Sequence, residues 1–293
     1  GQDGGNRFPG SQPVSLARDN MNEIGKQEYH VTWKADGTRY MLLLMKDGCY
    51  LIDRKFAVRR VQMRFPAPLK SHGVSVHHAT LLDGEMVVDN SAPGKQRRRF
   101  LAYDMMALFG GKLVDRPFVD RIALIQSHVV HPRNLFLVDA GKSASYNFSK
   151  EPFSIRQKDF FPLSGTEGTI RTFIPKLTHE CDGLIFQPSR MKYLTGTMDT
   201  LLKWKFTHLN SVDFLLKLVW VPGSGAAPAP RLYVGAERGE VIPVDEPSGE
   251  FTLGGVDHPD RAPDGTQLSD LDGQIVECTW EKDGRGEEVG AEG

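Results

Sequence analysis

Between residues 29 and 53, apolar runs that include strand-forming residues alternate with short polar turn sequences. We expect strands at Tyr29–Trp33, Arg39–Met45 and Cys49–Asp53, because turn sequences at Ala35-Asp36-Gly37 and Lys46-Asp47-Gly48 separate them. This order predicts a meander of antiparallel strands. Further strands are expected at Thr80–Asp89, Phe100–Asp104, Gly183–Gln187 and Thr200–Phe206.

One segment has the spacing of a helix. Ile122, Ile125 and Val129 fall on one face of a helix that runs from Pro117 to His131. Pro117 suits the first turn, and Pro132 is expected to end the helix. Strands combined with such a helix predict the α+β fold class.

Beyond Ser211 the pattern changes to short apolar strands between loops rich in Gly, Pro and Asp. These strands predict a small β-barrel. They are expected at Phe214–Val221, Arg231–Val234 and Gln274–Trp280, with surface loops at Pro222–Pro230 and Pro247–Gly265.

Composition narrows the class of protein. The 293 residues are 40% hydrophobic and 25% charged, and no apolar run approaches the roughly 20 residues of a membrane helix. A soluble intracellular protein of two domains is expected. The three cysteines are too far apart for a zinc motif or a disulfide framework, so we expect reduced thiols.

The formal net charge of −1 hides an asymmetry between the two parts of the chain. Residues 1–208 hold 30 of the 36 basic and 20 of the 37 acidic residues. The first part is therefore basic and the second acidic. This difference suits two bodies with different partners, and the basic first body suits a partner that carries phosphates. A solvated surface without a partner explains the asymmetry nearly as well.

The clearest chemical signal is the run Lys34-Ala-Asp36-Gly37-Thr-Arg39, a lysine at a strand end followed by a turn and an arginine. A lysine attacks phosphorus only as the neutral amine, which nearby cations and partial desolvation favour. Gly37 permits close approach of the backbone to a ligand, and Arg39 suits a ribose or a phosphate. Alone, these residues are also compatible with an ordinary hairpin carrying surface charges.

Other segments strengthen the phosphate interpretation. In the strand ending at Phe206, the period of two places Lys203 and Lys205 on one face, opposite Leu202, Trp204 and Phe206. Two lysines directed at one place suit an α-phosphate, and the alternative is a solvated strand face. The segments Asp83-Gly84-Glu85 and Cys181-Asp182-Gly183 are expected to place carboxylates at turns that enter apolar strands, where Asp182 suits a divalent cation.

Taken in order, these segments resemble the motif set of the covalent nucleotidyltransferase superfamily, which includes capping guanylyltransferases and nucleic-acid ligases. The motifs are KADGTR, LIDR, LLDGEMVVD, FLAYD, HECDGLIFQP and LLKWKF. The segments FPGSQPVS from Phe8, WKADGTRY from Trp33, DGLIFQP from Asp182 and LNSVDF from Leu209 are similar to metazoan mRNA capping enzymes in particular. The similarity spans roughly residues 7 to 282.

The resemblance implies a role for each matching residue. Lys34 would be the nucleophile that forms a lysyl-GMP phosphoramidate, and Asp182 would help to bind the catalytic metal. Tyr103 would stack on guanine, and Lys158 would read its O6. The remaining implied contacts are Arg39 and Glu85 with the ribose, Arg54 with the phosphates, and Lys203 and Lys205 with the α-phosphate.

The resemblance also implies an architecture. Antiparallel sheets with flanking helices would form a nucleotidyltransferase domain over residues 8–208, after a lead-in at 1–7. A β-barrel OB-fold domain would follow over 209–293. The family's Arg-x-Asp-Lys motif and closing helix have no match here, so the second domain is expected to be truncated. No Cys-x5-Arg phosphate loop precedes Phe8, so a triphosphatase activity is not expected.

The implied reaction uses Mg²⁺ or Mn²⁺ to move GMP from GTP, through the lysine, to the 5′-diphosphate end of an RNA. The implied partners are GTP, that RNA and the phosphorylated tail of RNA polymerase II, without a membrane, and the implied location is the nucleus. An ATP-dependent polynucleotide ligase is the alternative within the superfamily. A non-catalytic module that binds GTP or the polymerase tail is the alternative from another class.

Overall fold

The computed structural model describes residues 8–68, 75–92, 94–143, 146–147, 150–206, 209, 211–219, 229–235, 241–243 and 266–279. The chain divides into two compact units, Gly1–Lys205 and Phe206–Gly293. The expected lead-in at 1–7, most of the first expected loop and all of the second lie outside the described residues.

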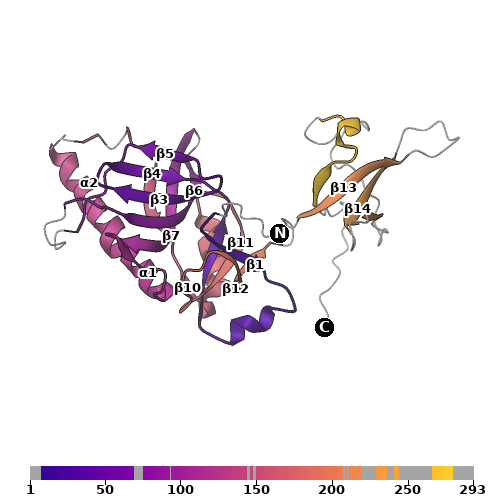
Figure 1. Ribbon diagram of the computed structural model, residues 1–293, viewed down its shortest axis with the longest axis horizontal. Helices are drawn as coiled ribbons and strands as arrows, with labels where there is room; N and C mark the ends of the chain where they lie inside the picture. Colours follow the sequence, from indigo (N-terminus) through magenta and orange to yellow (C-terminus); the bar gives the residue numbers. More distant parts are fainter. Residues whose placement is uncertain are drawn as a thin grey trace, which may run out of the picture. The chain divides into compact units, whose positions relative to one another are not determined.

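The larger sheet of the first unit has seven strands in the order β5-β4-β3-β6-β7-β8, with β9 paired to β7 (Figure 1). Its long central hairpin, β6 with β7, carries bulges that shift the register at three places, one of them between Asp83 and Gly84. The strands are β3 (Thr38–Met45), β4 (Gly48–Ile52), β5 (Val58–Val61), β6 (Thr80–Ala92), β7 (Lys95–Leu108), β8 (Gly111–Lys112) and β9 (Ser154–Gln157).

The smaller sheet of the first unit has the strand order β1-β12-β11-β2-β10. The pair β1 and β12 is parallel, and the other pairs are antiparallel. Apolar residues of β2, β11 and β12 form one core cluster on this sheet. Its strands are β1 (Ser11–Ser15), β2 (Tyr29–Ala35), β10 (Phe161–Pro162), β11 (Cys181–Pro188) and β12 (Gly196–Lys205).

The expected meander is wrong at its first turn. β2 pairs with β10 and β11, whereas β3 pairs with β4 and β6 in the other sheet. The chain therefore crosses between sheets at Asp36-Gly37 instead of folding into a hairpin. A Cβ at position 37 would overlap the carbonyl oxygen of Met86, so glycine lets the crossing chain lie against β6. The second expected turn does form an antiparallel pair, β3 with β4.

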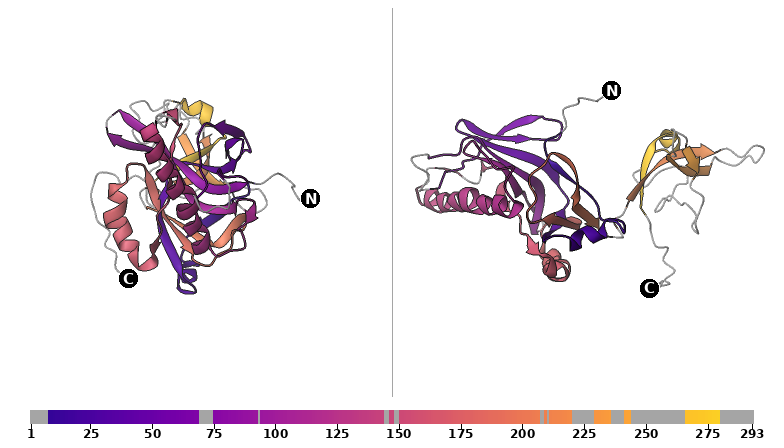
Figure 2. Two further views of the ribbon diagram at one scale, coloured as in Figure 1. Left: turned by 90° about the vertical axis from the view of Figure 1, so that its left-hand side faces the viewer. Right: turned by 60° about the horizontal axis from the view of Figure 1, so that its bottom comes forward.

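A continuous helical run lies along one face of the larger sheet (Figures 1 and 2). It consists of α1 (Phe118–Leu124), the π-helical segment η2 (Ile125–Val130) and α2 (His131–Ser143). Ile122, Ile125 and Val129 all face the core, as expected.

The expected end of this helix at Pro132 is wrong. Pro132 lies in the first turn of α2, directly after the π-helical segment. Proline lacks the N–H that an interior position would use, and here it lies where the bonding changes from the π-helical to the α-helical pattern, directly after His131. The wider π-helical turn absorbs the local misfit, so the helix continues to Ser143.

Short helical turns are the remaining elements among the described residues of the first unit. No helix among the described residues is long and apolar enough to cross a bilayer, and the three cysteines are free. The turns are η1 (Met21–Gly25), η4 (Leu163–Gly165), α3 (Thr166–Gly168), η5 (Thr169–Phe173) and η6 (Ile174–Lys176).

The described part of the second unit is one antiparallel sheet in the order β15-β14-β13-β16. Three of its strands, β13, β14 and β16, lie where the sequence predicted strands. The fourth strand, β15, was not predicted. Leu216 of β13 is its buried centre. The elements are β13 (Ser211–Val219), β14 (Ala229–Gly235), β15 (Val241–Pro243), β16 (Ile275–Thr279) and the turn η9 (Leu268–Leu271).

Candidate active site

Lys34 lies near the end of β2 and faces a carboxylate. Its Nζ is 2.5 Å from Oδ2 of Asp182, and Nζ of Lys205 is 4.0 Å from the same oxygen. The sheet register explains this arrangement, because Gly183 pairs with Lys34 on one side and with Lys205 on the other. Two cations from neighbouring strands therefore converge on one carboxylate.

The sequence predicted nearby cations at Lys34, and the structure places a carboxylate closer to it than Lys205. The nearest charged group is Asp182, and an ion pair stabilises the ammonium form of a lysine. The lysine is also partly shielded, with 24% of its side chain exposed. In this conformation the Asp182 carboxylate holds the Lys34 side chain in place.

Asp182 has one free oxygen. Oδ1 is buried and has no hydrogen-bond partner in the part of the chain that the structure describes. A buried carboxylate oxygen without a donor is costly, so it is suited to a cation that arrives with a ligand. No group of three or more His, Cys, Asp or Glu side chains converges among the described residues. This donor set fits Mg²⁺ or Mn²⁺ bound by one carboxylate together with substrate phosphates and water.

Gly183 is required at the centre of this arrangement. Its φ is +156°, and a Cβ at this position would overlap the backbone carbonyl of Trp204 on β12. A bulge between Cys181 and Gly183 shifts the register there and turns the Asp182 side chain toward Lys34. The absence of a side chain at Gly183 thus lets β11 and β12 approach closely.

The two faces of β12 follow the predicted period of two. Leu202 is fully buried, and Trp204 packs on the core cluster of the smaller sheet. Lys203 and Lys205 are on the other face, and Lys203 pairs with Ile185 of β11. Of these two lysines, Lys205 is the one that faces Asp182.

Arg39 is buried and held by protein groups. Its Nε and Nη2 donate to the two carboxylate oxygens of Asp83 at 3.0 and 2.6 Å, and Nη1 donates to the carbonyl of Ser11 at 2.7 Å. Tyr193 donates its hydroxyl to the same Asp83 at 2.6 Å. Burial opposes the charge on Arg39, but Asp83 outweighs that cost and raises the pKa of the guanidinium. Two of the five guanidinium N–H groups have no acceptor among the residues that the structure describes.

Lys158 is 4% exposed and is held by aromatic rings. Its Nζ lies 5.0 Å from the centroid of the Trp33 ring and 5.8 Å from that of Tyr103. Among the described residues this ammonium makes no side-chain hydrogen bond. Burial lowers the pKa of Lys158, and the neighbouring Glu85 opposes that shift. An ammonium in such a place is open to a hydrogen-bond acceptor from a ligand.

Glu85 lies on β6, opposite Arg39 of β3. Burial raises the pKa of its carboxyl group, while Lys158, Arg39 and Arg54 each act to lower it. Arg54 is exposed in the turn after β4. The ring of Tyr103 on β7 lies 5.7 Å from Cζ of Arg39.

The structure therefore brings eight of the nine predicted residues into one connected cluster. Lys34, Asp182 and Lys205 form one end, and ring contacts and charge interactions link Lys158 with the others. The remaining residue, Lys203, lies on the lysine face of β12 without a described contact to the cluster. The other members are Arg39, Arg54, Glu85 and Tyr103.

The segment Asp83-Gly84-Glu85 is not the turn that the sequence indicated. It lies in the middle of β6, and Asp83 is fully buried. The sequence contained a signal for this position, since a carboxylate inside an apolar strand needs a cationic partner. No local signal could have identified Tyr193, which lies 110 positions away from Asp83.

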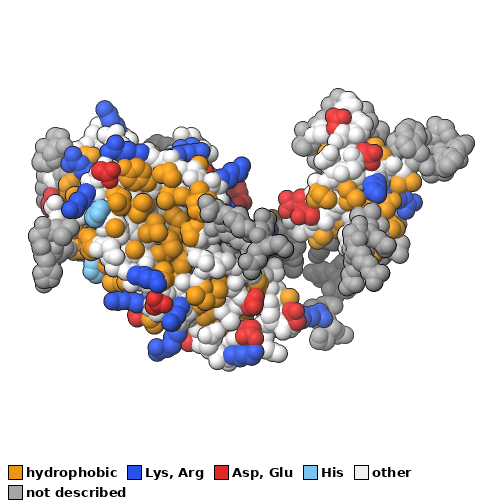
Figure 3. All heavy atoms as spheres, in the orientation of Figure 1, with side chains coloured by type: hydrophobic (Ala, Val, Ile, Leu, Met, Phe, Trp, Pro, Cys, Tyr) orange, Lys and Arg blue, Asp and Glu red, His pale blue; other side chains and the backbone are white. Residues whose placement is uncertain are grey.

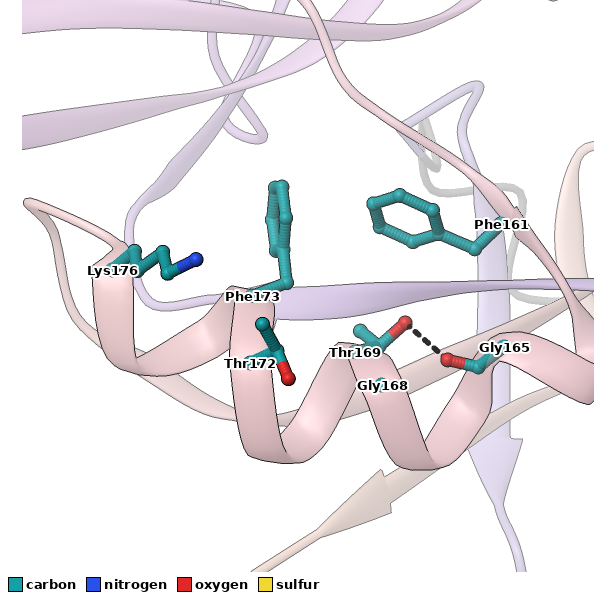
Figure 4. Close-up of a pocket in the computed structure, with 7 residues that line it drawn as sticks. All are labelled: Phe161, Gly165, Gly168, Thr169, Thr172, Phe173 and Lys176. Atoms are coloured by element: carbon teal, nitrogen blue, oxygen red, sulfur yellow. Dashed lines mark hydrogen bonds between the residues drawn. The ribbon is translucent and has the colours of Figure 1, made fainter.

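A separate cavity of about 380 Å³ lies beside the helical turns that precede β11 (Figure 4). None of the nine predicted residues lines it. The ring of Phe173 lies 5.0 Å from the rings of both Phe161 and Trp33, so the cavity borders the packing of Trp33. The lining residues are Phe161, Gly165, Gly168, Thr169, Thr172, Phe173 and Lys176.

Comparison with known proteins decides the family. The family model described as the catalytic domain of mRNA capping enzyme matches residues 2–207, which covers nearly all of the first unit. The chain belongs to this family. Lys34 and the residues around it therefore lie within the capping enzyme catalytic domain.

Proteins with similar sequences agree with this family assignment. The chain is 35% identical to the mRNA-capping enzyme of Danio rerio over 93% of its own length, and 34% identical to that of Mus musculus over 94%. It spans only 42% and 43% of the length of these two relatives. Among solved structures, mycobacterial DNA ligase D complexed with ATP and MES gives a TM-score of 0.42 at 15% identity. That match covers 78% of this chain and 68% of that chain.

Proposed function

We propose that this protein is an mRNA guanylyltransferase that moves GMP from GTP to the 5′-diphosphate end of an RNA through Lys34. The observation that carries the proposal is the convergence of Lys34, Asp182 and Lys205 inside the capping enzyme catalytic domain. A lysine amine beside a cation and an unpaired carboxylate oxygen is suited to attack on a nucleotide phosphate.

In the first step, the neutral Lys34 nitrogen forms a bond to the α-phosphorus of GTP and releases one N–H proton to water, and the bond from that phosphorus to the bridging oxygen breaks. Pyrophosphate leaves. In the second step, a β-phosphate oxygen of the RNA attacks the same phosphorus, the nitrogen–phosphorus bond breaks, and the lysine regains its proton. Lys203 and Lys205 neutralise charge on the α-phosphate during both steps.

The ion pair between Lys34 and Asp182 has to separate before the first step, because the attacking amine must be neutral. Asp182 would turn toward a divalent cation held at its Oδ1, and Lys34 would then be free to face the α-phosphate. The positive charge of Lys205 then favours loss of a proton from the Lys34 amine. Before GTP binds, the ion pair with Asp182 therefore holds the Lys34 side chain in position.

Asp182 would hold Mg²⁺ or Mn²⁺ through its free Oδ1, and the metal would supply charge neutralisation at the phosphates. The ribose is assigned to the two free N–H groups of Arg39 and to Glu85, and the outer phosphates to Arg54. Guanine would stack on Tyr103, with its O6 accepting from the Lys158 ammonium. An acceptor there would satisfy a buried ammonium that makes no side-chain hydrogen bond within the described residues.

Several wider features of the family belong to the proposal. The second unit is assigned as the OB-fold domain over residues 209–293, with a nucleotidyltransferase domain over 8–208 before it. The four described strands of that unit fit part of a barrel. Nuclear location and association with the phosphorylated tail of RNA polymerase II are proposed with it.

Labelling with nucleotide tests the activity. Incubation with α-labelled GTP and Mg²⁺ is expected to give an acid-labile covalent adduct, because a phosphoramidate hydrolyses in acid. The adduct should be absent from Lys34→Ala. Lys26→Ala is the matched control, since Lys26 is an exposed lysine paired with Glu23 and is expected to label normally.

The alternatives have distinct outcomes in the same experiment. Labelling by ATP and not by GTP would identify an ATP-dependent polynucleotide ligase. GTP or phosphopeptide binding in a calorimeter without any adduct would identify a non-catalytic binding module. Either result overturns the proposed guanylyl transfer.

A further inference from the structure

Trp33, the residue before Lys34, is part of a buried chain of hydrogen bonds. Its indole Nε1 donates to Nε2 of His179 at 3.0 Å. The other ring nitrogen of His179, Nδ1, lies 3.0 Å from Oδ1 of Asp89. The carboxylate of Asp89 is held in turn, because Thr178 donates to Oδ1 at 2.7 Å, while Nε of Arg99 lies 2.8 Å from Oδ2 as an ion pair without hydrogen-bond geometry.

The direction of these bonds determines the state of His179. An indole nitrogen only donates, so Nε2 of His179 must accept and cannot carry a proton. The proton is therefore on Nδ1 and is donated to Asp89. His179 is neutral in this arrangement, and its side chain is 5% exposed.

The same indole ring supports Lys158. The Lys158 ammonium lies 5.0 Å from the centroid of the Trp33 ring, and Phe173 packs against that ring, also at 5.0 Å. The position of the π face depends on the indole orientation, which the bond to His179 fixes. A tilt of the indole would move the surface on which the buried ammonium rests.

We infer that His179 is a positioning residue for base recognition: through Trp33 it holds the Lys158 ammonium where it reads the 6-oxo group of guanine. The inference deepens the proposed function and rests on it. Trp33 and His179 do not touch the nucleotide in this account. They set the orientation of the residue that does.

The inference predicts a dependence on pH. Asp89, Arg99 and Lys158 are the charged groups that act on His179, and burial lowers the pKa of His179 although Asp89 opposes the shift. Protonation would turn Nε2 into a donor facing the donor of Trp33, and the bond would be lost. The pKa of Glu85 is also raised, so the pH dependence of the unaltered protein contains more than one titration. The contribution of His179 is the difference in pH dependence between the unaltered protein and a variant whose side chain at position 179 does not titrate.

The test compares adduct formation with GTP and with 2-aminopurine riboside triphosphate, which lacks the 6-oxo group. In His179→Leu the ratio of GTP to analogue reactivity is expected to fall about fivefold, because the cation–π support is lost. Trp33→Phe removes the indole donor and should give a similar fall. His179→Gln keeps an acceptor and a donor, and is expected to restore the ratio and to remove the extra acid sensitivity that appears as the pH falls below about 6.5.

His77→Leu is the matched control, because His77 is another buried histidine with two hydrogen bonds outside the cluster. It should leave the ratio unchanged, and a ratio does not depend on the folded fraction. Equal losses for both nucleotides in His179→Leu, or the same acid sensitivity in His179→Gln, would overturn the inference. Absence of any adduct in the unaltered protein would instead mean that the proposed function has failed.

Discussion

Asp182 connects the proposed nucleophile with the proposed metal site. Its Oδ2 holds Lys34 and lies near Lys205, while its Oδ1 is buried without a described partner. Because only Oδ2 has a described partner, the carboxylate can accept a metal ion at Oδ1 and release Lys34 to the substrate phosphates. The sequence assigned this residue to a cation and did not predict that it would pair with the nucleophile.

Arg39 shows a similar limit of sequence reasoning. The spacing from Lys34 identified it as a ligand-binding residue, and the structure buries most of its donors against Asp83 and Ser11. The Asp83 carboxylate that orients Arg39 also accepts from Tyr193, which is distant in sequence and carries no local pattern. Contacts of that kind depend on the packing of two sheets and are not encoded near either residue.

The burial of His77 predicts how the stability of the fold depends on pH. It is buried between Thr80 and the carbonyl of His128, and burial lowers the pKa of its imidazole to about 4. The unfolded chain therefore binds the proton first, starting near the ordinary pKa of about 6.5. We expect His77 to reduce the free energy of unfolding by about 3 kcal/mol as the pH falls from about 6.5 to about 4.

Urea unfolding at a series of pH values measures this loss. In His77→Gln the pH dependence over the same range should be weaker, because the side chain does not titrate. His131→Gln, at an exposed position at the start of α2, should keep the dependence of the unaltered protein. Identical pH profiles for the protein and His77→Gln would contradict the assignment.

At the scale of elements, the site depends on the crossing of the chain between two sheets. The sequence predicted most strands, because alternating apolar positions report one buried face. It did not predict that β2 and β3 separate after Ala35, since a turn sequence does not specify which strands pair. That separation places Lys34 on the smaller sheet and Arg39 on the larger one.

Substitution of Gly183 tests the approach of β11 to β12. In Gly183→Ala the new methyl group would overlap the Trp204 carbonyl, so the strands must move apart. We expect a loss of about 2 kcal/mol in the free energy of unfolding, together with weaker labelling because Lys205 moves away from Asp182. Gly25→Ala, where a Cβ meets nothing within 4 Å, is the control and should unfold like the unaltered protein. Unchanged stability and labelling in Gly183→Ala would show that this close approach is not needed.

At the scale of the whole molecule, the division into two units parallels the distribution of charge. The first unit ends at Lys205, close to the end of the family match at residue 207. Basic residues predominate in residues 1–208. On the face shown in Figure 3, Lys and Arg side chains of the first unit occur at several separate places instead of forming one patch. On this face, the distribution of positive charge therefore does not by itself define where an RNA would bind.

In the proposed reaction, one lysine among several near Asp182 becomes guanylylated. Mass spectrometry of peptides after incubation with GTP and Mg²⁺ tests it directly. The account predicts GMP on the peptide that contains Lys34, with Lys158, Lys203 and Lys205 unmodified. Guanylate on any of these three lysines while Lys34 stays unmodified would contradict it.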